Sequence, residues 1–223
     1  MKKFSIIIPT RNEGEGIERI IRSVMRYSDD IIVVDGHSKD KTKEIAHKLG
    51  AKFYLDHGLG KGDAMKVGMQ KAKYDILIYF DADGSHDEKD ISKIASLLLS
   101  KKADFVMGSR RTGGSFDVSM SFQGIIRSAG CDLLVMLINH KFQTKLTDVL
   151  YSFRGTRKDI FRSLQLKDNG FGIEQEMVVS CLKKGFLVSE IPSREKARGW
   201  GESKLSTISG VKFLWNILLE YIK

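Results

Sequence analysis

The sequence predicts an α/β fold with a mostly parallel central sheet. Along the first hundred residues, short apolar runs typical of buried strands alternate with segments whose apolar side chains recur at helical spacing. Strands separated by helices form βαβ crossovers, in which the strands run parallel. The composition, 42% hydrophobic and 29% charged, is that of an ordinary globular protein.

The first half of the chain accounts for most of the expected sheet. Its apolar runs are Phe4–Ile8, Ile31–Val34, Ala51–Leu55, Ile76–Phe80 and Phe105–Met107. Helical spacing is clearest at two sets of residues: Ile17, Ile20, Ile21 and Val24, then Ile91, Ile94, Ala95 and Leu98. These patterns place helices between the strands.

The second half is predicted to contain longer helices. We expect helices over residues 122–138 and from about 173 to 184, and strands near 151–154 and 187–191. Residues 194–204 are rich in glycine and charge, which favours a loop over a site rather than a linker. A further helix is expected at the end of the sequence.

Polar side chains follow three of the expected strands where each strand ends. They occupy residues 9–13, 35–38 and 81–84. Ligands of open parallel sheets bind outside the C-terminal ends of the strands, so a ligand site is expected at these loops. Their carboxylates would repel one another unless a cation or a hydrogen-bonding ligand lay between them.

Asp81 and Asp83 are the candidate metal ligands. They follow a buried strand and precede Gly84. Mg²⁺ and Mn²⁺ prefer oxygen ligands and commonly take one or two carboxylates together with phosphate oxygens of a substrate. A lone Asp-x-Asp pair often only caps a turn, but placement at a strand end favours the metal.

The net charge of +9 indicates an anionic partner. A nucleic acid, an acidic lipid and a phosphorylated substrate all fit that charge, as does a merely solvated basic surface. No nucleic-acid-binding motif is present, so we expect no nucleic acid partner. The chain has no signal-peptide pattern and no run of about 20 apolar residues, and its two cysteines lack metal-ligand spacing. We therefore expect a cytoplasmic protein with reduced thiols.

Seven motifs, in order along the chain, resemble family 2 glycosyltransferases of the GT-A fold. The family motifs are IPTRNE (8–13), DGHSKDKT (35–42), GKGDA (60–64) and DADG (81–84). Three more resemble the dolichyl-phosphate mannose synthase branch: GSR (108–110), DVLYSFR (148–154) and RGWGESK (198–204). The resemblance covers nearly the whole chain and implies a Rossmann-like sheet, a nucleotide-sugar donor and a Mg²⁺ or Mn²⁺ cofactor.

The resemblance also implies roles on the donor side. Pro9, Arg11 and Glu13 match the loop that flanks the nucleotide base and ribose. Asp35 matches the acid that contacts the nucleoside, and Asp63 falls beside the base-side loop. Arg11 or Glu13 could instead cap the following helix, and Asp35 could anchor a turn.

The remaining matched positions surround the phosphates. Asp81 and Asp83 match the metal- and diphosphate-binding acids, with Asp83 taken as catalytic. Arg110, Arg198 and Lys204 match basic positions near the phosphates of the donor or the acceptor, although Arg110 could be a surface ion pair.

Four residues depart from the family pattern. Arg11 replaces a common tyrosine, His37 a small residue, and Ser85 a frequent glutamine. These departures bear on which nucleotide base the sugar donor carries. Ser152 replaces the glycine usual in the branch, which bears on an acceptor-side role for Arg154.

The acceptor decides whether a general base is needed. A polyprenyl phosphate is already ionised near neutral pH, so positioning and charge neutralisation suffice. An alcohol acceptor would need a base, for which Glu174 and Glu176 are candidates. One of the two acids could instead be the solvated side of its helix, and Glu176 could equally bind the acceptor or order the basic loop.

The C-terminal segment combines a narrow polar stripe with an apolar remainder. Lys212, Asn216 and Glu220 lie four residues apart, and the remaining residues of 211–222 are apolar. At about 18 Å, such a helix is too short to cross a bilayer of about 30 Å. It could lie on an anionic membrane surface or pack against the domain or a second copy.

We therefore expect one GT-A domain over residues 1–223, with acceptor-side and membrane- or partner-facing helices in 121–223. The expected reaction is transfer of a hexose, mannose from GDP-mannose, to a polyprenyl (dolichyl) phosphate with inversion, at the cytoplasmic face of a membrane. A UDP-sugar donor or a sugar-alcohol acceptor fits the first four motifs equally well. A non-catalytic basic binding module is the third alternative.

Overall fold

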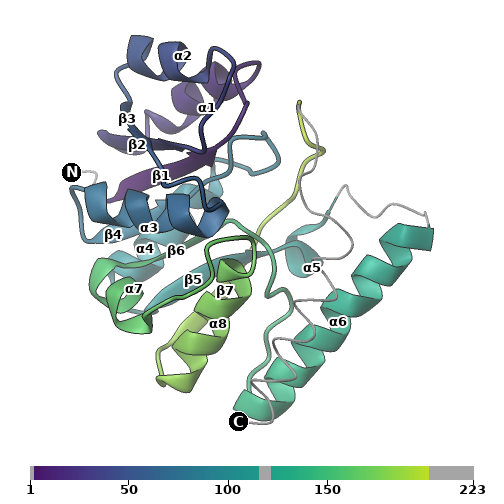
Figure 1. The fold of residues 1–223 in the computed structure, drawn as a ribbon. Coiled ribbons are helices and arrows are strands. Elements are labelled where there is room, and N and C mark those ends of the chain that lie inside the picture. Colours follow the sequence, from purple (N-terminus) through teal and green to yellow (C-terminus); the bar gives the residue numbers. More distant parts are fainter. Residues whose placement is uncertain (1–2, 116–121, 201–223) are drawn as a thin grey trace.

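The computed structural model describes residues 3–115 and 122–200 and, within 122–128, the backbone alone. A seven-stranded sheet lies at its centre, with helices on both faces (Figure 1). The strands are β1 (Ser5–Thr10), β2 (Asp30–Asp35), β3 (Lys52–Leu55), β4 (Ile76–Tyr79), β5 (Phe105–Ser109), β6 (Arg154–Arg157) and β7 (Val188–Pro192). The helices are α1 (Ile17–Val24), α2 (Thr42–Lys48), α3 (Lys61–Lys71), α4 (Asp90–Leu99), α5 (Arg110–Gly113), α6 (Phe122–Phe142), α7 (Lys158–Leu164) and α8 (Ile173–Lys183).

The strand order is β3-β2-β1-β4-β6-β5-β7. Neighbouring strands pair in parallel except at β6, which is antiparallel to both β4 and β5. The prediction of an α/β fold with a mostly parallel sheet is therefore confirmed.

The strand predicted near 151–154 was placed too early. Tyr151 and Phe153 are buried, but the ladder begins at Arg154, which pairs with Tyr79 of β4. The two aromatic rings pack beside the sheet next to His86 instead of extending the strand. Apolar character located the buried segment but not its pairing.

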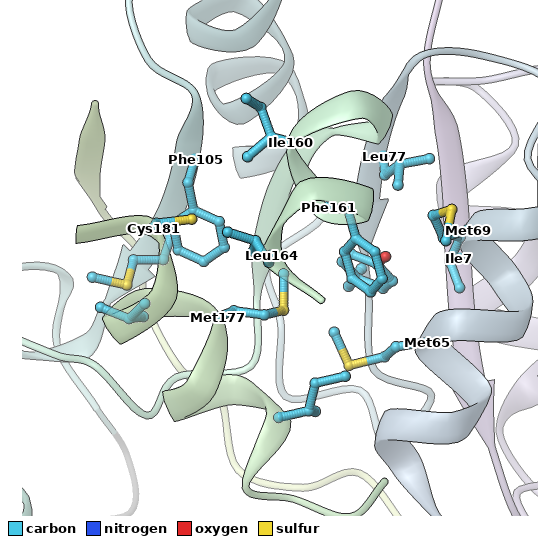
Figure 2. Close-up of a cluster of buried hydrophobic side chains, with 14 of the residues drawn as sticks. Ile7, Met65, Met69, Leu77, Phe105, Ile160, Phe161, Leu164, Met177 and Cys181 are labelled. Atoms are coloured by element: carbon cyan, nitrogen blue, oxygen red, sulfur yellow. The ribbon is translucent and has the colours of Figure 1, made fainter. Parts of the chain in front are cut away.

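The period of two along β1 divides the core into two layers. Ile7 joins the cluster formed with α3, α6, α7 and α8, whereas Ile6 and Ile8 join the cluster formed with α1, α2 and α4. Figure 2 shows side chains of α3, α7 and α8 converging on the first face. Gly68 of α3 lies against the sheet, where an added Cβ would stand 2.3 Å from Cγ2 of Ile7. The glycine therefore permits the close approach of helix and sheet.

Helix α6 stands beyond α5 and α8, away from the centre of the sheet (Figure 1). Within the described ranges, no helix is long and apolar enough to cross a membrane. The helix expected over 211–222 lies outside the described residues.

Candidate active site

Asp81 directly follows Phe80 at the end of β4 and is held from several sides. Its carboxylate lies 2.8 Å and 3.0 Å from Nζ of Lys61 and accepts a 2.5 Å hydrogen bond from Oγ of Ser152. Burial raises the pKa of Asp81, but the charge of Lys61 and the hydrogen bonds from Lys61 and Ser152 outweigh it and bring the pKa well below its ordinary value. Asp81 is therefore an ionised carboxylate at neutral pH.

Lys61 lies between two acids at the start of α3. Its ammonium lies 2.8 Å from Oε1 of Glu174 as well as against Asp81, and 5.9 Å from the ring centroid of Phe171. Burial opposes its charge, but the two carboxylates raise the pKa above its ordinary value. Sequence reasoning assigned a role in the GKGDA motif only to Asp63 and missed this cation. Its place in that motif was the available signal.

Asp83 is held by its own turn on one side and by an arginine on the other. Oδ1 accepts hydrogen bonds from the backbone N–H and Oγ of Ser85, at 3.0 Å and 2.7 Å. Oδ2 lies 2.9 Å from Nη2 of Arg198, whose Nη1 lies 3.7 Å from Oε1 of Glu13. Three predicted site residues, Glu13, Asp83 and Arg198, are thus brought together.

Residues 194–200 follow β7 and reach back over this edge. The backbone N–H of Lys196 donates to the carbonyl of Ser85, and that of Gly199 donates to the carbonyl of Asp83, at 2.8 Å and 2.9 Å. Nε1 of Trp200 donates to the carbonyl of Ala82 at 3.1 Å. A loop over the site was predicted here, and its described part has this position. Lys204 lies outside the described residues.

Two glycines accommodate the indole of Trp200. A Cβ on Gly16, just before α1, would stand 1.7 Å from Cε2 of Trp200. A Cβ on Gly84 would stand 2.9 Å from Cη2, and Gly84 has a φ of +79°. The indole therefore occupies space that any larger residue at either position would take. Sequence reasoning gave Trp200 no role of its own.

His86 is buried immediately beneath the acids. Its Nδ1 accepts the backbone N–H of Asp81 at 3.2 Å, and its Nε2 lies 3.0 Å from Oγ of Ser152. Burial lowers the pKa of His86 more than the neighbouring acids raise it, which favours the neutral imidazole.

The predicted nucleoside side is a network of short turns. Asp35, at the end of β2, accepts from both the backbone N–H and Oγ of Ser38. Oγ of Ser38 also accepts the backbone N–H of Asn12 at 2.6 Å, which ties the loop after β1 to the loop after β2. Asp35 therefore anchors the turn that follows β2, which was the alternative considered for it. A role in binding the nucleoside stays a prediction, as it does for Pro9 and the exposed Arg11.

Asp63 is engaged by a histidine from the loop after β3. Its carboxylate accepts the backbone N–H of His57 at 2.6 Å and lies 2.8 Å from Nδ1 of that ring. Burial raises the pKa of Asp63, but these bonds bring it below its ordinary value. The neighbouring Asp56 has a raised pKa because of burial and the charge of Asp63. An acidic corner thus lies beside the β2 and β3 loops.

Arg110 is neutralised by acids of the chain itself. Nε and Nη2 contact Asp148 at 2.6 Å and 3.1 Å, and Nη1 lies 3.5 Å from Glu195. The guanidinium also lies over the ring of Tyr151, 5.2 Å from its centroid. Arg110 therefore forms an ion pair, but not the surface pair considered as its alternative, because Asp148 is buried. Its proposed contact with a phosphate stays a prediction.

Arg154 and Glu176 hold the scaffold together. Arg154 is fully buried and donates to the backbone carbonyls of Tyr151 and Glu174. Glu176 accepts the backbone N–H groups of residues 167–168. Both side chains are thus engaged by the chain's own backbone, and an acceptor-side role for either stays a prediction.

The acids at this edge fit a divalent cation of the kind that also binds substrate phosphates. Within the described ranges, no group of three or more His, Cys, Asp or Glu side chains could hold a metal on its own. Mg²⁺ commonly takes only one or two protein carboxylates. The two carboxylates are similarly enclosed, but Asp83 is paired with the partly exposed Arg198, whereas Asp81 is paired with the more enclosed Lys61, so Asp83 is the ligand whose cation is more readily exchanged.

Comparison with known proteins identifies the family of this fold and site. The profile of glycosyl transferase family 2 matches residues 5–165. The chain belongs to glycosyl transferase family 2. Membership of this family supports a glycosyltransferase activity and agrees with the resemblance found in the motifs.

Several relatives of this family 2 chain are archaeal. It is 30% identical over 199 residues to the glycosyltransferase AglJ of Haloferax volcanii, covering 84% of this chain and 61% of that protein. It is 29% identical over 224 residues to the dolichol-phosphate mannosyltransferase of Pyrococcus furiosus, covering 96% and 62%. The chain thus spans about three fifths of each. It spans 91% of the uncharacterized protein MJ1222 of Methanocaldococcus jannaschii, with 28% identity and 97% of this chain covered.

The fold of the family 2 chain is shared with solved structures. Glucosyl-3-phosphoglycerate synthase from Mycobacterium tuberculosis, in complex with Mn²⁺, UDP-glucose and phosphoglyceric acid, superposes with a TM-score of 0.78. The match has 18% identity and covers 99% of this chain and 80% of the other. At this identity the likeness establishes the GT-A fold alone.

Proposed function

We propose that this family 2 glycosyltransferase transfers a hexose, mannose from GDP-mannose, to a polyprenyl phosphate with inversion at the anomeric carbon. The observation that carries the proposal is the pairing of acids and cations after β4, where Asp81 and Asp83 meet Lys61 and Arg198. A diphosphate leaving group needs its developing charge neutralised, and such a cluster supplies both a metal-binding carboxylate and cations.

Asp83, with Asp81 beside it, would hold the divalent cation. When bound, Mg²⁺ or Mn²⁺ neutralises charge on the diphosphate. Arg198 would leave Asp83 for the donor phosphates, because it is partly exposed and belongs to a segment without a helix or strand. Lys61 would stay in place because two acids hold it.

A phosphate acceptor agrees with the state of the candidate bases. Glu174 is already the ion-pair partner of Lys61, and Glu176 is bound by backbone N–H groups outside the acidic cluster. An ionised phosphate oxygen attacks without a base, so neither acid has to accept a proton. The relative in Pyrococcus furiosus supports the same acceptor class.

A UDP-sugar donor is the second candidate. It is favoured by the M. tuberculosis synthase, which has this fold and was solved with UDP-glucose and Mn²⁺. A membrane contact through residues 211–222, outside the described residues, completes the proposal. Co-sedimentation with anionic vesicles tests that contact, and equal partitioning after removal of 211–223 would exclude it.

The main test measures transfer of radiolabel from GDP-mannose or UDP-glucose into a short polyprenyl phosphate, with Mn²⁺ or Mg²⁺. We expect label from GDP-mannose, and Asp83→Ala should lower its transfer by on the order of 10²-fold or more. Asp159→Ala, at an exposed acid of α7, serves as the control. Circular dichroism and thermal unfolding check that both variants fold. Full activity of a folded Asp83→Ala variant would exclude the metal site, and label from UDP-glucose alone would select the second candidate.

A further inference from the structure

A closed ring of three hydrogen bonds lies behind the carboxylate of Asp81. The backbone N–H of Asp81 donates to Nδ1 of His86 at 3.2 Å. Nε2 of His86 lies 3.0 Å from Oγ of Ser152, and that hydroxyl lies 2.5 Å from Oδ2 of Asp81. The ring therefore begins and ends on the same residue.

The chemistry of the groups fixes the direction of every bond. A backbone N–H can only donate, so Nδ1 of His86 must be the acceptor. A neutral imidazole then carries its proton on Nε2 and donates it to Ser152. The hydroxyl of Ser152, with its oxygen occupied as an acceptor, directs its own hydrogen to Asp81.

The imidazole of His86, which links Asp81 to Ser152 in the ring of hydrogen bonds, is held in one orientation by its packing. The side chain of His86 is fully buried and stacks on Phe153, with ring centroids 4.8 Å apart and planes 11° apart. Phe80 and Tyr151 meet it edge-on, at 5.2 Å and 5.1 Å. Three aromatic rings thus hold the histidine in one orientation, which fixes the position of the Ser152 hydroxyl.

We propose that Ser152 and His86 are positioning residues that set the orientation of the Asp81 carboxylate. Lys61 contacts both carboxylate oxygens and would follow a rotation of the group, whereas the Ser152 hydroxyl binds Oδ2 alone. The ring therefore selects one rotamer, in which Asp81 serves the metal and the diphosphate. This inference rests on the proposed function of the site.

Ser152→Ala is the cleanest test because it removes one hydroxyl and leaves the buried aromatic packing in place. Loss of a group that orients a metal ligand typically costs about 10- to 100-fold in metal affinity or activity. We expect kcat for transfer to fall about 10-fold with little change in the KM of the donor, and Mn²⁺ affinity without the donor, measured by electron paramagnetic resonance, to fall similarly. Ser152→Thr keeps the hydroxyl and should restore both. Ser163→Ala removes a hydroxyl that bonds within α7 and should change neither.

A second measurement tests the ring of hydrogen bonds directly and does not depend on the sugar-transfer reaction. Nitrogen-15 chemical shifts of His86, assigned by their loss in His86→Asn, should show an unprotonated Nδ1 and a protonated Nε2 that responds to Ser152→Ala. The double variant Ser152→Ala with His86→Asn should lower kcat and Mn²⁺ affinity by no more than the more damaging single substitution, because each substitution breaks the same ring of hydrogen bonds.

Wild-type kcat and Mn²⁺ affinity in a folded Ser152→Ala variant would overturn the proposal, as would a lowered melting temperature with unchanged kcat and Mn²⁺ affinity. A protonated Nδ1 would also overturn it. Absence of transfer by the wild-type chain would instead refute the proposed function, and the Mn²⁺ and nitrogen-15 measurements would still decide the ring.

Discussion

Each of the two acids that follow β4 is paired with a cation of the chain. The pairs differ in burial: Lys61 is largely enclosed between Asp81 and Glu174, whereas the side chain of Arg198 is 33% exposed. Because one partner reaches water, the Arg198–Asp83 pair costs less to separate than the more enclosed Lys61–Asp81 pair. Arg198 can therefore leave Asp83 more readily than Lys61 can leave Asp81, which makes Asp83 the acid where a metal and an arginine compete.

This competition gives Arg198→Gln opposite effects on two quantities. Without the donor, Mn²⁺ should bind on the order of fivefold more tightly, since the ion pair that competes for Asp83 is worth on the order of 1 kcal/mol. Transfer should slow by on the order of 10²-fold, because a cation for the diphosphate is lost. Calorimetric titration and the transfer assay measure the two effects, with Arg22→Gln on the exposed face of α1 as the control. Weaker Mn²⁺ binding in Arg198→Gln would contradict the competition.

At the residue scale, the sequence could locate acids but not their partners. Asp81 and Asp83 are predictable because a buried run ends just before them. Lys61 reaches Asp81 across 20 positions and Ser152 reaches it across 71, so only the folded chain brings them together. His86 was missed for the same reason, since a histidine near an acidic motif is equally consistent with a surface residue.

At the element scale, amphipathic periodicity found the helices with one apolar face. It gave no comparable signal for α3, whose buried residues include Asp63 and two glycines because the helix lies against both the sheet and residues 168–169. Nor does a period of two report strand direction. The antiparallel setting of β6 follows from the path of the chain through α6, which no local pattern encodes.

The segment between β7 and Trp200 is held at its end by the indole of Trp200 as well as by backbone hydrogen bonds and by Arg198. Gly16→Ala should displace Trp200, since the new Cβ would stand 1.7 Å from Cε2. The displacement should shift Arg198 and lower kcat/KM by about 10- to 100-fold, because misplacement of about 1 Å has effects of this size. In a Trp215→Phe background, Trp200 is the only tryptophan, and its fluorescence emission should move to longer wavelength.

Gly130→Ala is the matched control for Gly16→Ala. Gly130 lies in α6 with nothing within 4 Å of an added Cβ, so emission and activity should stay as in the parent. Unchanged emission in Gly16→Ala would mean that the indole does not occupy this position in solution.

At the scale of the whole molecule, the two edges of the sheet have different tasks. The acids of the site gather where β1, β2 and β4 end. At the opposite edge, Asp30 at the start of β2 accepts from Oγ of Ser5 at 2.5 Å, Nζ of Lys52 at 2.6 Å and the backbone N–H of Lys73 at 2.8 Å. One buried carboxylate thus joins the starts of β1, β2 and β3 to the end of α3. This edge belongs to stability rather than to catalysis.

Asp30→Asn should therefore lower global stability without lowering transfer at neutral pH. The amide nitrogen of asparagine would face groups that donate hydrogen bonds to the carboxylate, and a buried group left without a hydrogen bond costs about 1–3 kcal/mol.

The stabilisation by Asp30 should also depend on pH. Burial raises the pKa of Asp30, but the bonds from Lys52, Ser5 and Lys73 bring it below the ordinary value of 3.8. A lowered folded pKa means that the contribution is fully present above the unfolded pKa and disappears as pH falls through the folded one. The difference in unfolding free energy between wild type and variant, measured with urea from pH 7 to pH 3, should stay constant down to about pH 5 and narrow below about 3.8. Asp159→Asn, at an exposed acid, should show no such narrowing. A difference that stayed constant through pH 3 would mean that the lost hydrogen-bond geometry, and not the charge of Asp30, stabilises this edge.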